Sequence, residues 1–403
     1  MKNIKVGIGA NWGDEGKGLF IDYLASKAKD GIVVRFNSGA QAGHTVVTPE
    51  GKRHVFGHFG SGTMVGTPTY LSSFFVVNPL LFRKESTDLE KEGVDPWVYM
   101  DKDCIVTTPY DMMINQIVEA HRGDAKHGSC GVGFNETIVR SESSGLKLIV
   151  SDLLDTAKAR QKLDIIRKDY VYDRLLALGV KDIPEDFIKY FKSENIVDRY
   201  IEDIIYMLDM TETTDISILD RYESIIFEGA QGLMLDQGHK YFPHVTRSNT
   251  GMKNVRVLLK EAGLENEPIE ITYITRAYLT RHGAGPFPTE LSEKPYEKIV
   301  DLTNVRNAFQ GSLRFGILDI NLLAETIAND LGDDSCSIAI TCLDQVGDKI
   351  SYMIGDELYN TSIKDFIQYV QSIVSADRVY ISSGPTRNTI VASEVSTIKE
   401  VLV

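Results

Sequence analysis

The sequence predicts an α/β fold with a mainly parallel central sheet and flanking helices. Short apolar segments alternate with segments of helical periodicity, which is typical of parallel sheets. Several apolar segments end in glycine-rich loops, and a parallel sheet collects such loops along one edge. The stretch at about residues 153–210 is helical in pattern throughout, and it predicts a helical insertion into this fold.

Six apolar segments are expected to form strands, because they are short and bounded by turn residues. These segments are residues 4–8, 31–36, 224–227, 269–274, 337–341 and 378–381. A helix is expected directly after the first strand and its glycine-rich loop. The four cysteines show no CxxC spacing, so the sequence suggests neither a zinc site nor a disulfide framework.

Length and composition indicate an ordinary globular protein. Of 403 residues, 43% are hydrophobic and 25% are charged. No linker or repeat interrupts the chain, so residues 1–403 are expected to form a single domain. The formal net charge of -14 argues against nucleic-acid binding. The absence of a signal peptide and of a long apolar run favours a cytoplasmic protein without a membrane partner.

The loop at residues 9–18 is the most informative stretch. A glycine-rich turn from strand to helix directs backbone N–H groups at an anion, and Lys17 adds a charge for phosphate. The usual phosphate loop continues with Ser or Thr, whose hydroxyl holds Mg²⁺, but here Gly18 takes that place. Asp14 is therefore the candidate metal ligand, because a carboxylate beside phosphate requires a cation between them. The alternative is a tight turn with solvated charges.

Three further loops follow predicted strands. His44, in the loop at residues 39–45, is a candidate general acid or stabiliser of a phosphoryl group, or alternatively a capping histidine. Gln231 can orient a substrate oxygen through its amide N–H, or it belongs to a polar turn. Asp344 can accept two N–H groups of guanine, or it caps a turn.

Together these segments resemble the adenylosuccinate synthetase family. In the family's order they are WGDEGKG (12–18), AGHT (42–45), FEGAQG…LD (227–236), VTRSNT (245–250), RHGAGPFPTEL (281–291), TCLD (341–344) and SSGP (382–385). The resemblance implies a P-loop-like fold and a two-step ligase reaction. GTP phosphorylates the 6-oxygen of IMP, and L-aspartate displaces that phosphate to give adenylosuccinate, GDP and phosphate. The alternatives are a variant ligase that uses GMP, dGMP or another amine, a non-catalytic nucleotide-binding regulator, and a GTPase switch.

The resemblance also implies a set of site residues. Asp14, His44 and Gln231 would be catalytic, with Asp14 taking the proton from N1 of the purine, and Asp14 and the Gly43 carbonyl would hold Mg²⁺. GTP would contact Gly13, Asp14, Glu15, Gly16, Lys17, Gly18, Gly43, His44, Thr45, Asp344, Ser382 and Gly384. The nucleotide substrate would contact Asp14, Lys17, Gln41, Ser129, Arg140, Gln231 and Thr246. A homodimer is expected, with Arg140 completing the neighbour's nucleotide site.

The sequence departs from the family pattern in the loop that would bind aspartate. Where the family carries an arginine-dense segment, residues 303–319 keep Arg314 near the expected place and Arg306 upstream. Arginine suits the bidentate capture of carboxylates, so Arg314, Arg306 and Asn307 are the candidate ligands of the amino acid. Cys342 also stands where a lysine is usual.

Overall fold

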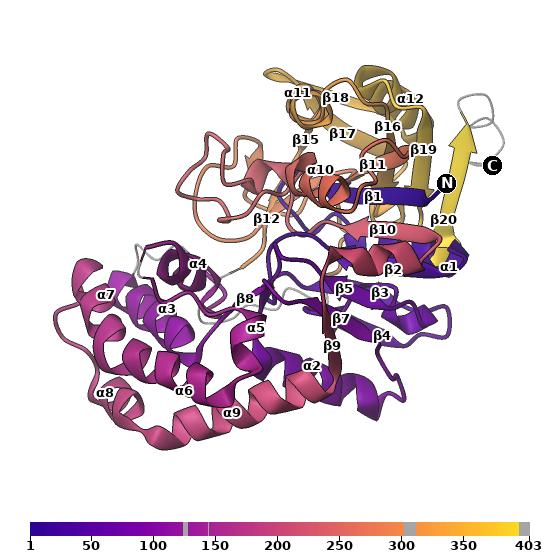
Figure 1. The fold of residues 1–403 in the computed structure, drawn as a ribbon. Coiled ribbons are helices and arrows are strands. Elements are labelled where there is room, and N and C mark those ends of the chain that lie inside the picture. The colour runs from indigo at the N-terminus through magenta and orange to yellow at the C-terminus, as the bar shows by residue number, and fades with distance from the viewer. Residues whose placement is uncertain (124–127, 144, 302–311, 395–403) are drawn as a thin grey trace.

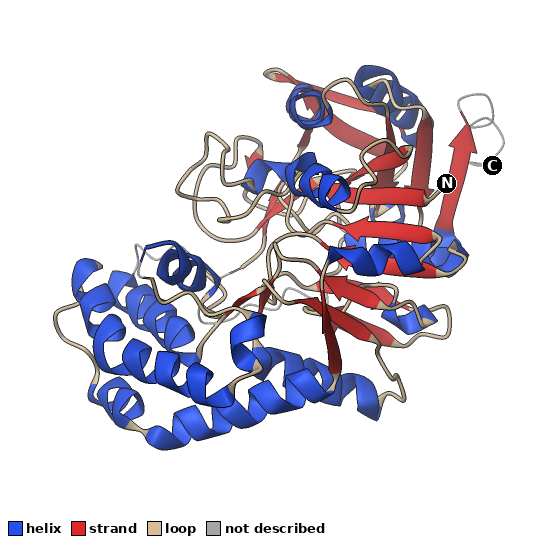
Figure 2. Cartoon of the chain, in the orientation of Figure 1, coloured by secondary structure: helices blue, strands red, loops and turns tan. Residues whose placement is uncertain are grey.

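The computed structural model describes residues 1–123, 128–143, 145–301 and 312–394. Its centre is a ten-stranded sheet in the order β20-β19-β16-β11-β1-β10-β2-β5-β7-β9 (Figures 1 and 2). All neighbouring pairs are parallel except β19 and β20, which are antiparallel. The strands are β1 (Asn3–Gly9), β2 (Gly31–Arg35), β5 (Thr69–Leu71), β7 (Val98–Asp101), β9 (Thr211–Thr214), β10 (Ser224–Glu228), β11 (Ile269–Arg276), β16 (Cys336–Thr341), β19 (Arg378–Ser382) and β20 (Ile390–Glu394). The predicted fold class is confirmed, and all six predicted strands overlap strands of this sheet.

Smaller sheets and helices surround the centre. The shorter strands are β3 (His44–Val47), β4 (Arg53–Phe56), β6 (Val76–Val77), β8 (Ile105–Val106), β12 (Leu279–Arg281), β13 (Glu290–Leu291), β14 (Arg314–Gly316), β15 (Leu318–Asp319), β17 (Lys349–Ile354) and β18 (Glu357–Ser362). The helices are α1 (Lys17–Lys27), α2 (Pro79–Lys91), α3 (Pro109–Arg122), α4 (Phe134–Ser143), α5 (Val150–Leu153), α6 (Thr156–Ile165), α7 (Val171–Ala177), α8 (Glu185–Lys192), α9 (Glu194–Asp209), α10 (Met252–Glu261), α11 (Ile320–Leu331) and α12 (Ile363–Val374).

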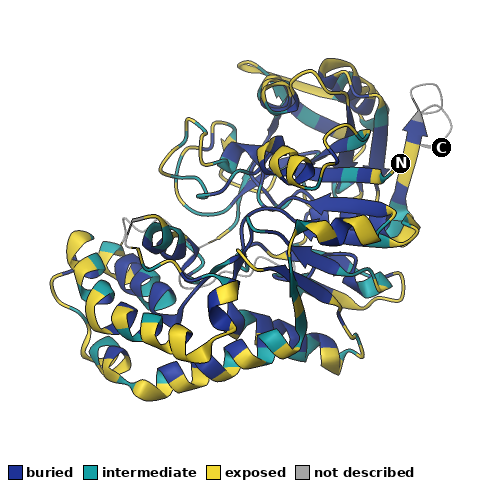
Figure 3. Cartoon of the chain, in the orientation of Figure 1, coloured by how far each residue is buried: buried dark blue, intermediate teal, exposed yellow. Residues whose placement is uncertain are grey.

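The central strands are apolar because helices cover both faces of the sheet. Strands β10 and β16 are buried at every position, as parallel strands usually are (Figure 3). Successive residues of a strand point to opposite faces of the sheet. Ile225 packs into the core that includes α10, α11 and α12, whereas Ile226 packs against α1. The continuous apolar runs in the sequence therefore reflect burial on two sides.

Helices α5–α9 form most of a lobe at the lower left of Figure 1. They cover the range predicted as a helical insertion, and the chain then returns to the sheet through β9. This lobe packs on a core to which α2, α3 and the central strands β5 and β7 also contribute. Across the described part of the chain, no helix combines the length and apolar character needed to cross a membrane.

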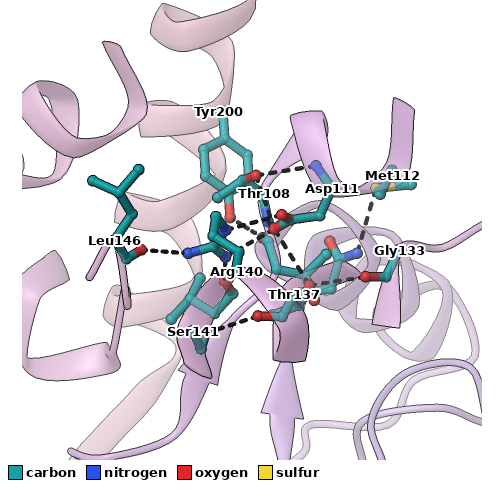
Figure 4. A network of polar contacts seen from close by, with 12 residues as sticks. Thr108, Asp111, Met112, Gly133, Thr137, Arg140, Ser141, Leu146 and Tyr200 are labelled. Atoms are coloured by element: carbon teal, nitrogen blue, oxygen red, sulfur yellow. Dashed lines mark hydrogen bonds and ion pairs between the residues drawn. The ribbon is translucent and has the colours of Figure 1, made fainter. Parts of the chain in front are cut away.

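A buried ion pair joins α4 to α3 in this lobe (Figure 4). The side chains of Arg140 and Asp111 are both 0% exposed. Arg140 Nε and Nη2 donate to the two Asp111 carboxylate oxygens at 2.9 and 2.8 Å. Its Nη1 and Nη2 also donate to the carbonyls of Leu146 and Val106 at 2.7 and 2.8 Å. Asp111 is held in turn by a capping box with Thr108 at the start of α3.

This network corrects the expectation that Arg140 completes a neighbouring subunit's nucleotide site. Its guanidinium has no exposed surface, and its donors are directed at groups of its own chain. Arginine at this position therefore stabilises the packing of α4 on α3.

Replacing Arg140 with methionine should destabilise the fold by about 3–5 kcal/mol, because the carboxylate of Asp111 would stay buried without its partner. Urea denaturation measures this loss. The matched variant Arg140→Met/Asp111→Asn removes both charges and keeps a side chain that can cap α3, so it should recover much of the loss. A loss below about 1 kcal/mol in the single variant would contradict this account.

Candidate functional site

Two adjoining cavities lie where glycine-rich loops leave the carboxyl ends of parallel strands, the usual place for a ligand in such sheets. The first cavity, of about 240 Å³, is lined mainly by residues 12–18 and 41–45. The second, of about 440 Å³, is lined by Ser129 and Thr246 among other residues. The described residues that line both cavities are Gln41, Gln231, Leu235 and His282.

The first cavity is built on the start of α1. Gly16 caps this helix with φ of +87°, a conformation that glycine adopts without strain. A Cβ atom at Gly18 would lie 2.6 Å from the carbonyl oxygen of Thr45. Glycine at position 18 therefore lets β3, which begins with His44, approach α1 closely. The hydroxyl of an ordinary phosphate loop is missing here because the second loop occupies its space.

Glu15 and Lys17 form a buried ion pair inside the loop. Their side chains are 3% and 4% exposed, and Lys17 Nζ lies 2.7 Å from Glu15 Oε2. The other oxygen, Oε1, accepts the backbone N–H groups of Asn11 and Gly13 at 2.8 and 3.0 Å. Glu15, which the resemblance places near GTP, is thus engaged in folding the loop.

Asp14 has the left-handed conformation, with φ of +59°, and it lines the first cavity. Its Oδ2 lies 3.1 Å from His282 Nε2. Burial raises the pKa of Asp14, but the hydrogen bond and charge of His282, with the charges of Arg276 and Lys17, lower it to about 2. The carboxylate is therefore ionised at neutral pH. Gln231 is also left-handed, with φ of +65°, and strained residues of this kind gather at functional sites.

His44 lies in the wall of the first cavity, between a carboxylate and that cavity. Its Nδ1 lies 2.6 Å from Oε1 of Glu228, a residue that is completely buried. Among the described residues, His44 Nε2 has no hydrogen-bond partner. Burial, with the nearby charge of Arg35, lowers the pKa of His44 to about 4 although Glu228 acts to raise it. A neutral imidazole that donates Nδ1–H to Glu228 leaves Nε2 for a ligand.

The titratable residues of this site that were not identified from the sequence include Glu228, Arg276 and His282. Glu228 ends β10 within the FEGAQG segment, and its position three residues before Gln231 was the available signal. Arg276 and His282 line the first cavity. No sequence spacing connects them to Asp14, because β11 and β12 approach the first loop only in the folded chain.

The remaining predicted residues lie in several places. Gly43 and Thr45 line the first cavity, and Gln41 and Gln231 line both. Ser382 ends β19 and Gly384 follows it, beside β16, whereas Asp344 is exposed in the turn after β16. Asp344, Ser382 and Gly384 thus follow neighbouring strands at the cavity edge of the sheet.

Arg314, the expected ligand of the amino acid, is paired with a carboxylate of its own chain. Arg314 Nε and Nη2 donate to the two carboxylate oxygens of Glu290 at 2.7 and 2.5 Å. Its Nη1 donates to the carbonyls of Gly283 and Gly285 at 3.1 and 3.0 Å. The guanidinium is therefore occupied in holding a loop, and Arg314 lines neither cavity. The other two candidates, Arg306 and Asn307, lie outside the described residues.

Comparison with known proteins identifies the family. The adenylosuccinate synthetase family model matches residues 6–354. An adenylosuccinate synthetase of Thermodesulfovibrio yellowstonii is 31% identical over 382 residues, which are 93% of this chain and 85% of that protein. The chain belongs to the adenylosuccinate synthetase family. It is accordingly a GTP-dependent ligase of that family, as the resemblance implied.

Solved structures share the fold of this adenylosuccinate synthetase homologue. A fully ligated adenylosuccinate synthetase from Plasmodium falciparum matches with a TM-score of 0.77 and 18% identity, over 97% of this chain and 100% of that one. The succinoaminodeoxyadenylate synthetase of cyanophage S-2L, bound to dGMP and to dATP as an energy donor, matches with a TM-score of 0.65 and 14% identity. That match covers 99% of this chain and 97% of the cyanophage chain.

The His44–Glu228 pair predicts a pH-dependent stability. The pKa of His44 falls from 6.5 to about 4 on folding, so between these values the unfolded chain binds the extra proton. The pKa of Glu228 falls from 4.5 to about 2, so its contribution is present above pH 4.5 and is lost as pH falls towards 2. The free energy of unfolding should therefore decrease as pH falls from about 7 to about 4.

Urea denaturation of His44→Gln measures the histidine part of this dependence, because glutamine can still donate to Glu228 but does not titrate. Its stability should fall less than that of wild type between pH 6.5 and about 4. His121→Gln, at an exposed histidine, should keep the wild-type slope. Parallel profiles for wild type and His44→Gln would contradict the prediction.

Proposed function

We propose that this chain joins L-aspartate to C6 of IMP and, with GTP as phosphoryl donor, forms adenylosuccinate, GDP and phosphate. The observation that carries the proposal is the meeting of the two cavities at Gln231 and His282. One cavity is lined by a phosphate loop, and the other offers Ser129 and Thr246 to a nucleotide. A purine in the second cavity would present its 6-position to a phosphoryl donor in the first.

In the first proposed step, the Asp14 carboxylate takes the N1 proton of IMP and electron density moves to O6. O6 then attacks the γ-phosphorus of GTP, and the bond from that phosphorus to the leaving oxygen of GDP breaks. Lys17 and the N–H groups at the start of α1 hold phosphate oxygens. His44 Nε2 contacts the phosphoryl group as it is transferred, and Gln231 orients the purine. Phosphoryl transfer depends mainly on such positioning and charge stabilisation.

In the second proposed step, the aspartate amine attacks C6 and loses a proton, while the bond from C6 to the phosphorylated oxygen breaks and phosphate leaves. Arg306 and Asn307 remain the proposed ligands of the aspartate carboxylates, on the family resemblance. Asp344 is proposed to accept two N–H groups of the guanine of GTP, which adenine does not offer in the same arrangement. Ser382 and Gly384, which follow the adjacent strand, would lie beside that base.

The donor set fits Mg²⁺. Asp14 is ionised and lines the first cavity, where the carbonyl of Gly43 is a second oxygen donor. The described residues contain no group of three or more His, Cys, Asp or Glu side chains arranged for a metal. Few protein ligands suit Mg²⁺, which usually keeps waters and binds substrate phosphates. When bound, Mg²⁺ would neutralise charge on the phosphoryl oxygens.

A homodimer, on the family resemblance, and a cytoplasmic location also remain part of the proposal. Arg140 gives the homodimer no support, because its guanidinium is buried within its own chain.

A second candidate function is the same chemistry on dGMP. The structural likeness to the cyanophage S-2L enzyme, which binds dGMP and dATP, favours this alternative. The departure of residues 303–319 from the arginine-rich family pattern also favours it.

Product analysis separates the two candidates. The protein is incubated with aspartate, Mg²⁺ and either GTP or ATP, together with IMP, GMP or dGMP, and products are identified by mass. We expect adenylosuccinate from IMP with GTP. Product from dGMP and none from IMP would replace the first candidate with the second, and no product from any nucleotide would contradict both.

Asp14→Asn should lower kcat by at least about 100-fold, because the amide cannot take the N1 proton and binds a metal weakly. Steady-state kinetics measure the loss, and thermal unfolding verifies that the variant is folded. Asp182→Asn, at an exposed position in the helical lobe, is the matched control and should keep the wild-type rate. An Asp14→Asn rate within about tenfold of wild type would contradict the assignment.

A further inference from the structure

Strand β12 contacts the phosphate loop through two consecutive side chains. Thr280 Oγ1 donates to the carbonyl of Gly13 at 3.4 Å. The guanidinium carbon of Arg281 lies 4.0 Å from the centre of the Trp12 ring, a close cation–π contact. Arg281 and Trp12 are only 1% and 3% exposed, so this contact is buried. These contacts hold β12 against the phosphate loop. In the loop they lie immediately before Asp14, and in the other segment they lie immediately before the residue that follows β12.

The residue that follows β12 is His282, and it also contacts the phosphate loop. Its Nε2 lies 3.1 Å from Asp14 Oδ2, and both side chains are 26% exposed. His282 also lines both cavities, together with Gln231. The histidine thus contacts the proposed base at the place where the purine and the phosphoryl donor would meet.

The loop after His282 is held by hydrogen bonds from two arginine side chains. Gly283 and Gly285 have φ of +72° and +107°, and their carbonyls accept from Arg314 Nη1. The carbonyl of Ala284 accepts from Arg281 Nη2 at 3.0 Å. The backbone on both sides of His282 is therefore tied to neighbouring side chains, so the position of the imidazole is determined by the fold.

We propose that His282 is a positioning residue for Asp14, and this inference rests on the proposed function. A carboxylate on a short side chain can rotate about its last bond, which would turn either oxygen towards the substrate. The N–H donated by His282 holds Oδ2 and presents Oδ1 to N1 of the purine. A misplacement of about 1 Å at such a group costs about 100-fold in rate.

Leucine at position 282 removes the N–H donor and keeps an apolar side chain of moderate size. His282→Leu should lower kcat about 10- to 100-fold and leave the KM values of GTP and the nucleotide within about threefold. His282→Gln can place an amide N–H near the position of Nε2 and should recover most of that loss. The matched control is His121→Leu, at an exposed histidine that lines neither cavity, and it should keep the wild-type kcat. A wild-type kcat in His282→Leu, or a loss confined to KM, would overturn the proposal.

A double variant tests whether His282 acts through Asp14. In the Asp14→Asn background, replacing His282 with leucine should change the residual rate by less than about twofold, because there is no longer a base to orient. If His282→Leu costs as much in that background as in wild type, the histidine acts on the substrate directly and the positioning role is overturned.

The contact itself can be tested without turnover. In protein with ¹⁵N-labelled histidine, the Nε2 signal of His282 is identified by its loss in His282→Gln. Asp14→Asn should shift that signal, whereas Asp182→Asn should not. No shift would overturn the proposal whatever the substrate is, while a shift together with no product from any nucleotide would contradict only the proposed function.

Discussion

The site depends on the interactions that the buried Glu15 carboxylate makes. One of its oxygens accepts two N–H groups of the phosphate loop, and the other pairs with Lys17. Since all these groups are buried, each would carry a large desolvation cost if it lost its partner. The loop is therefore folded around an internal anion. Asp14, the next residue towards the N-terminus, takes the left-handed conformation and lines the cavity.

The second constraint is the balance of charge at the carboxyl edge of the sheet. The chain has a net charge of -14, yet a site for phosphates requires positive charge. Lys17 and Arg276 supply it next to Asp14 in the first cavity. Behind His44, Arg35 and Glu228 are both buried and their charges oppose one another in setting its pKa. Local pairing of this kind lets an acidic protein build a site for anions.

The pairing of arginines shows what a local sequence pattern leaves open. Arg140 and Arg314 were assigned to substrates by their distance from family motifs, but each is bound bidentately by a carboxylate of its own chain. A guanidinium group pairs with a carboxylate that the fold places within hydrogen-bond distance. For Arg140 that carboxylate is Asp111, at the N-terminal turn of another helix. Such partners are distant in the sequence, and no local pattern reveals them.

The sequence by itself determined the parallel sheet, its six recognisable strands and the loops that carry Asp14, Lys17, His44 and Gln231. It could do so because strand burial and glycine-rich turns are local patterns, and because parallel strands bring their carboxyl ends to one edge. Only the tertiary structure decided which side chains meet there. The contacts of His282 with Asp14 and of Glu228 with His44 join segments far apart in the chain. Their distances depend on how the small sheets that contain β12 and β3 pack beside the central sheet, which no spacing in the sequence records.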